Sequence, residues 1–128
     1  MAGMREALHS WFSAKVDNLN DGLRDIAKES AEEGEKLTKQ FIETRGTAKS
    51  GKQGRIETGA MLDSVSSAVV RETKDEIQTR FGYNDAPYYT VFQELGTSQV
   101  EPMYALTDAS EEVFEDLRKD IERLVNSV

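Results

Sequence analysis

The spacing of apolar residues over positions 4–44 predicts one long amphipathic helix. Apolar or small side chains recur every three or four positions, which is the helical period, and acids and lysines fill the other faces. At about 1.5 Å per residue this helix is roughly 60 Å long, more than a domain of this size can cover, so part of the stripe must meet another surface. The stripe consists of Leu8, Phe12, Val16, Leu19, Leu23, Ile26, Ser30, Gly34, Leu37 and Phe41.

Residues 18–23, NLNDGL, are the point where this helix could break, because Asn, Asp and Gly are turn formers. The stripe keeps its phase across them, which favours a continuous or merely bent helix. The alternative is a chain that folds back at Asn20-Asp21-Gly22 and covers its own stripe.

A loop and a β-hairpin are predicted to follow. Residues 45–59 contain four glycines and no apolar period, which is typical of a flexible loop, and TGAMLDS then offers one short turn. Two β-rich runs, 64–72 and 76–83, flank the polar segment TKDE, which suits a hairpin connection. On the second run every second residue is expected on the same side of the strand, namely Ile77, Thr79, Phe81 and Tyr83.

A short helix is predicted from Tyr88, because Tyr88, Val91, Phe92 and Leu95 fall at i, i+3, i+4 and i+7. These four side chains are expected to pack the helix onto the hairpin. Gly96 stands where a helix-ending residue with positive φ is wanted. The segment TSQV that follows is predicted to be extended.

Pro102 is expected to open the last helix, since proline is favoured at a first helical position. The chain thus reads as a single domain with a long helix (1–44), a loop (45–59), a hairpin with a short helix (60–101) and a C-terminal helix (102–128). This order predicts an α+β fold with a small antiparallel sheet rather than alternating βαβ units. The last helix is marked by Leu106, Val113, Leu117, Ile121 and Leu124.

The charge balance is strongly acidic and uneven. The net charge is −8, which argues against a general nucleic-acid binder. The net charge is −3 for residues 1–44 and −9 for residues 57–128, whereas it is +4 for residues 45–56. That basic island could touch a DNA backbone without reading sequence, but a solvated linker is the favoured interpretation. Its cations are Arg45, Lys49, Lys52 and Arg55.

The residue inventory offers no positive sign of catalysis. The chain lacks cysteine, which rules out disulfides and thiolate chemistry, and its glycines form no phosphate-binding loop. His9 is interpreted as a helix-surface or interface residue. Neighbouring carboxylates such as Glu32 with Glu33, and Glu115 with Asp116, are read as solvated helix faces. We therefore expect no catalytic residue, cofactor or metal ion, and no membrane span or secretory signal.

Two motifs resemble a family of small virion proteins of tailed phages. The segment ETGAMLDSV (57–65) is similar to the family's acid-Thr-Gly-x-x-Leu-x-x-Ser-aliphatic segment, and YYTVFQELGT (88–97), followed by a proline and ALTDA (105–109), is similar to its second signature. The family is named for the tenth gene product of a lambdoid coliphage, a tail component. The match covers roughly residues 57–110.

This resemblance implies a structural protein of the virion neck, present in the host cytoplasm during assembly. Such a protein would form a homo-oligomeric ring between a head-side connector or stopper and a tail-side terminator, around a DNA channel. Sixfold symmetry is favoured for this ring, with twelvefold symmetry as the alternative. The alternative is a soluble assembly factor or small interaction protein acting as monomer or dimer.

The expected subunit contacts are the uncovered end of the long helix and, in one of two interpretations, Glu94. In the other interpretation Glu94 caps or pairs with a nearby backbone amide or arginine within its own chain. The helix residues expected in the contact are Leu8, Trp11, Phe12 and Val16.

Overall fold

The computed structural model describes residues 3–45, 59–96 and 102–127 and has the predicted α+β fold. The predicted extended TSQV segment lies outside these residues. Helix and strand bounds agree with the sequence-based ones to within three residues. The elements are α1 (Gly3–Thr44), α2 (Ala60–Asp63), β1 (Val65–Glu72), β2 (Ile77–Tyr83), α3 (Thr90–Leu95) and α4 (Ala105–Ser127).

Helix α1 is continuous over 42 residues, so the alternative in which the chain folds back at residues 20–22 is wrong. Gly22 allows close packing of α4 on α1 instead of forming a turn. A Cβ atom at that position would lie 2.6 Å from a methyl group of Leu124, so the missing side chain lets the end of α4 approach α1.

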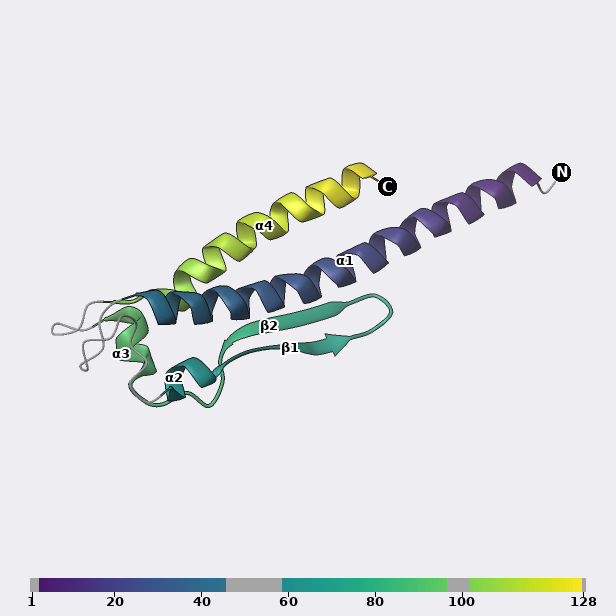
Figure 1. Cartoon of the computed structure of the whole chain (residues 1–128). Coiled ribbons are helices and arrows are strands. Elements are labelled where there is room, and N and C mark those ends of the chain that lie inside the picture. The colour runs from purple at the N-terminus through teal and green to yellow at the C-terminus, as the bar shows by residue number, and fades with distance from the viewer. Residues whose placement is uncertain (1–2, 46–58, 97–101, 128) are drawn as a thin grey trace.

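The long helix lies between the other two layers, with the hairpin on one side and α4 on the other (Figure 1). A helix covered on two sides must bury more than one stripe, and small side chains allow both neighbours to come close. The buried residues of α1 are accordingly Ser30, Ala31, Gly34, Thr38 and Ile42. They all lie in its C-terminal half.

The two strands pair antiparallel, with Val65 opposite Tyr83 and a register irregularity between Val69 and Arg71. The predicted alternation on β2 is confirmed, because its odd-numbered residues are the half-buried ones. The Thr79 hydroxyl donates to the Ala27 carbonyl of α1 at 2.9 Å. The hairpin is therefore held to α1 by polar as well as apolar contacts.

The main hydrophobic core sits at the C-terminal end of α1. There α1, α2, the start of β1 and the residues that precede α4 come together. The fully buried members are Ile42, Met61, Val65, Met103 and Ala105, and Phe41, Leu62, Tyr83 and Tyr89 pack against them. This core fixes the end of the molecule that is opposite the N-terminus.

Gly34 is expected to be the least replaceable glycine of α1. A Cβ atom there would lie 2.3 Å from the Cγ atom of Phe81, which is the ring atom nearest the backbone of β2. We expect Gly34→Ala to destabilise the protein by about 1–2 kcal/mol, because overpacking outweighs the gain in helix propensity.

Gly22→Ala is the matched control for Gly34→Ala. Its added Cβ atom would lie 2.6 and 2.8 Å from the two methyl groups at the flexible end of the Leu124 side chain, so it should cost less than Gly34→Ala in urea denaturation. Equal effects of the two substitutions would contradict the close ring contact.

Candidate functional site

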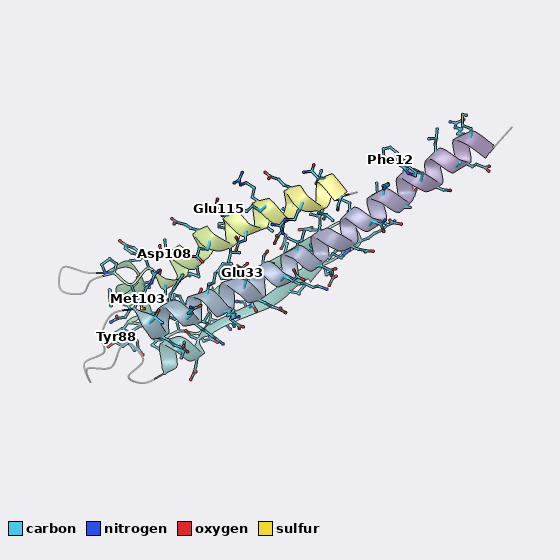
Figure 2. The ribbon with its side chains drawn as sticks, turned by 45° about the horizontal axis from the view of Figure 1, so that its top comes forward. Phe12, Glu33, Tyr88, Met103, Asp108 and Glu115 are labelled. Atoms are coloured by element: carbon cyan, nitrogen blue, oxygen red, sulfur yellow. The ribbon has the colours of Figure 1, made fainter. Side chains whose placement is uncertain are left out.

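The N-terminal part of α1, residues 3–18, projects beyond the rest of the molecule, and we call it the arm (Figure 1). Its apolar side chains are uncovered, as the helix length predicted. Trp11 is 56% exposed and Phe12 is 64% exposed, and Phe12 can be seen on the projecting stretch in Figure 2. The other exposed apolar residues of the arm are Met4, Leu8 and Val16.

The apolar face of the arm has a defined shape. The Trp11 and Phe12 rings meet edge to face with centroids 5.9 Å apart, and the Lys15 ammonium lies 5.7 Å from the Trp11 ring centroid. Beside the rings is a shallow hollow that one apolar side chain of a partner could enter. The hollow is lined by Leu8, His9, Phe12, Ser13, Val16 and Asp17. His9 thus lies on the helix surface, next to the candidate contact.

A second uncovered apolar face lies on α3, which contradicts the prediction that its apolar residues pack onto the hairpin. Tyr88 is 86% exposed and Phe92 is 49% exposed, and Val91 and Leu95 are exposed as well. The helix instead buries Thr90 and Glu94, one turn apart on its other side. We call Val91, Phe92 and Leu95 of α3, together with Tyr88 in the turn just before the helix, the α3 face.

Glu94 explains why α3 is turned this way. Its side chain is only 6% exposed, and its carboxylate accepts hydrogen bonds from the Tyr83 hydroxyl at 2.8 Å and from the Leu106 and Thr107 backbone N–H groups at 3.0 Å each. The Thr107 hydroxyl also donates to it, at 2.9 Å. Burial, together with the Glu94 carboxylate, raises the pKa of Tyr83 above its usual range, so this phenol remains a donor.

The interaction of Glu94 with α4 is that of a helix cap supplied by another element. An N-cap side chain normally accepts from the second and third N–H groups of its own helix, and a negative charge there also suits the helix dipole. The Glu94 carboxylate accepts from both of the corresponding N–H groups of α4, those of Leu106 and Thr107. The intrachain interpretation of Glu94 is therefore confirmed, and its assignment to a subunit interface is corrected, because the carboxylate is buried and already has four donors.

Helix α4 begins at Ala105 rather than at the predicted Pro102. The backbone N–H groups of Met103 and Tyr104 donate to the carbonyls of Gln93 and Glu94 at the end of α3, at 2.8 and 3.1 Å. Tyr104 has a φ of 51°, which is incompatible with a right-handed helix. Proline's preference for a helix start is thus overridden by the pairing of these residues with α3.

Arg45 is not a free cation of the basic loop, contrary to expectation. It directly follows α1, donates to the Met103 carbonyl at 2.9 Å, and forms an ion pair with Asp108 in the first turn of α4. Its guanidinium lies 4.0 Å from the centroid of the Phe41 ring. Arg45 therefore tethers α4 to α1, while the other cations proposed to contact DNA, Lys49, Lys52 and Arg55, lie outside the described residues.

Two carboxylates meet between α1 and α4, where the sequence predicted only solvated faces. Glu33 lies on the stretch of α1 beside α4 (Figure 2). It shares a hydrogen bond with Asp116 of α4. Burial, that hydrogen bond and the charges of Asp116, Asp120 and Glu112 raise the pKa of Glu33 to about 7. Glu32 and Glu115 are exposed, as expected.

The contribution of Glu33 to stability is expected to fall as pH rises from about 4.5 to about 7. Glu33 ordinarily titrates near 4.5, so the folded chain binds more protons than the unfolded chain across this window. Glu33→Gln should flatten that dependence and stabilise the protein at pH 8 by about 1 kcal/mol, allowing for solvent screening. Urea titrations at pH 5 and pH 8 measure the free energy of unfolding of both chains. Glu32→Gln is the exposed control, and the same gain in both variants would argue against the Glu33–Asp116 pair.

Gly96 ends α3 with a φ of 80°, as predicted. With its ψ of 169° this backbone conformation is open almost only to glycine. We expect Gly96→Val to lower the free energy of unfolding by about 1 kcal/mol or more. Leu95→Val, at the exposed neighbouring helical position, should have a smaller effect in the same thermal melts. Matching losses would show that the strain is not specific to residue 96.

Neither a candidate metal site nor a membrane-spanning helix is found among the described residues. No group of three or more His, Asp or Glu side chains there is arranged to hold a metal ion. The helices over the same residues include none with the length and apolarity needed to span a bilayer. The candidate functional features of the described residues are the arm and the α3 face, both of which are exposed apolar surfaces.

Sequence reasoning found the first surface and missed the second. The arm followed from helix length, whereas the α3 residues have the spacing of a packed amphipathic helix and gave no signal of exposure. Comparison of the chain with family models, curated proteins and solved structures found no match.

Proposed function

We propose that this chain is a structural subunit of a tailed-phage neck and forms a ring between the head connector and the tail. The observation that carries the proposal is the uncovered apolar face of the arm. Contiguous exposed apolar surface marks interaction sites in proteins, and large aromatic side chains such as Trp11 and Phe12 are common anchors of interfaces. A ring supplies the partner surface from an identical subunit.

The assignment to a phage neck rests on the resemblance of residues 57–65 and 88–109 to the neck-protein motifs. The second motif has a structural meaning in this chain. Its glutamate, Glu94, caps α4, and its glycine, Gly96, ends α3. The acidic balance of residues 57–128 suits a channel through which DNA passes without sticking, since like charges repel the phosphates. For the rest of the basic island, Lys49, Lys52 and Arg55, a solvated linker stays the favoured interpretation and contact with that DNA the alternative.

Purified particles of the phage that encodes this sequence provide the test. Quantitative mass spectrometry of these particles should find the chain in the few copies that one ring contains, at a fixed ratio to the head connector. Images of the neck should show the corresponding density. A chain that is abundant in infected cells but missing from purified particles would overturn the structural role.

That contrary result would favour the alternative of an assembly factor. The same arm favours this alternative, because an amphipathic helix can also bind in the groove of another protein. The purified chain would then be a monomer or dimer at every concentration, and its arm would bind a virion component only before particles are complete.

A further inference from the structure

We infer that the arm of one subunit binds the α3 face of the next copy of this chain, in a head-to-tail contact. This inference rests on the proposed ring and names the surface that receives the arm. Phe12 and Tyr88 lie at opposite ends of the molecule in Figure 2, so the two faces cannot meet within one chain. Between two copies they can meet, and the pair then still has one free arm and one free α3 face.

The two surfaces match in length. From Leu8 to Val16 the arm extends about 12 Å, and the six residues of α3 extend about 9 Å, at 1.5 Å per helical residue, with Tyr88 in the turn before them. Each face is one helix wide. The hollow beside Phe12 on the arm is the kind of hole that receives a protruding side chain of a facing helix. Phe92 and Leu95 are exposed side chains of the right kind to enter it.

The two surfaces also match in character. A third of this protein's residues are charged, yet no residue of the α3 face is, and the one charged side chain of α3, Glu94, is buried. The corresponding arm residues Leu8, Trp11, Phe12 and Val16 are also uncharged. Docking one face on the other therefore removes water mainly from apolar surface, and the charged side chains nearest the contact are Lys15 beside Trp11 and Asp17 in the lining of the hollow.

The exposed area of these residues approaches that of a specific contact. Large aromatic side chains have areas of about 150–250 Å², and the exposed parts of the four side chains on each face amount to roughly 400–500 Å². One contact therefore buries roughly 900 Å² from these residues alone, close to the ~1,000 Å² expected of specific interfaces. Arm-to-arm pairing would bury a similar area but would end at a dimer and leave every α3 face in water.

Complementation between two variants tests the inference. The arm variant carries Trp11→Asp and Phe12→Ser, and the face variant carries Val91→Asp and Leu95→Ser. All four side chains are exposed, so both variants should fold. We expect wild-type oligomers by mass photometry, monomers for each variant alone, and a one-to-one heterodimer on mixing, because one intact arm and one intact α3 face remain.

Each other outcome of the mixing experiment overturns the contact. A face variant that still dimerises alone indicates arm-to-arm pairing. An arm variant that still forms oligomers shows that the arm is dispensable. A mixture that stays monomeric, or a wild-type chain that is monomeric at all concentrations, shows that these two faces do not bind each other.

Cysteine cross-linking gives a second measurement that leaves the large anchors in place. The chain has no native cysteine, so Ser13→Cys on the arm and Val91→Cys on α3 can be placed in separate, differently tagged chains. Under mild oxidation the mixed dimer should predominate over both homodimers. Ser127→Cys, at the exposed end of α4, replaces Val91→Cys as control and should give no such excess. Equal yields for the two partners would overturn the inference.

These results are separable from the proposed function. If the chain is found in purified particles but the 13–91 cross-link is absent, the neck role stands and the contact is wrong. If the cross-link forms and the chain is absent from particles, the contact stands and the neck role is wrong.

Discussion

Replacing Trp11 by Asp together with Phe12 by Ser is expected to abolish oligomers of this protein while leaving the fold intact. Both rings are more than half exposed in the single chain, so their removal takes little from its interior. In an assembly they would be the largest apolar anchors of the arm, and truncating such anchors costs about 2 kcal/mol or more each. Affinity between subunits should therefore fall by at least 100-fold.

The measurement combines analytical ultracentrifugation with circular dichroism and thermal melting. Ser10→Asp with Ala14→Ser is the matched control, since it adds the same charge to the opposite, exposed face of the arm. It should assemble like the parent. A lower melting temperature of the monomer in the Trp11→Asp, Phe12→Ser variant would mean that these rings stabilise the chain itself, and the interface proposal would have to be dropped.

Glu94→Ala is expected to be the most destabilising single change at the α3–α4 corner, by about 3 kcal/mol. It removes the acceptor of four hydrogen bonds and leaves the N–H groups of Leu106 and Thr107 without a partner at the start of α4. Loss of an N-cap typically costs about 1 kcal/mol, and loss of a charged acceptor to buried donors costs about 1.5–3 kcal/mol.

Chemical denaturation of three variants separates these contributions. Tyr83→Phe removes only one of the four donors and should cost about 1 kcal/mol. Glu111→Ala replaces an exposed glutamate of α4 and should change stability by less than about 0.5 kcal/mol. If Glu94→Ala melts like Glu111→Ala, the carboxylate is not the cap of α4.

Periodicity by itself determined the elements of this protein. The stripe of α1 is a local property of the sequence and keeps its phase through residues 18–23, so the helix was predictable as one unit. The hairpin followed from alternation on β2, and the end of α3 from Gly96. The exposure of the arm also followed from the sequence, because helix length grows with residue number whereas the covering surface of a small domain does not.

The tertiary structure alone decided how the short elements are turned. A six-residue helix has too little apolar area to fix its own orientation, and α3 turns its polar side inward because Glu94 gains four hydrogen bonds there. Its apolar residues are exposed as a consequence. The sequence likewise indicated that Arg45 belongs to a basic loop. Only its pairing with Asp108, 63 residues later, makes it a tether for α4. Such long-range pairings leave no periodic trace in a single sequence, because the partners are brought together only when the layers on either side of α1 have packed.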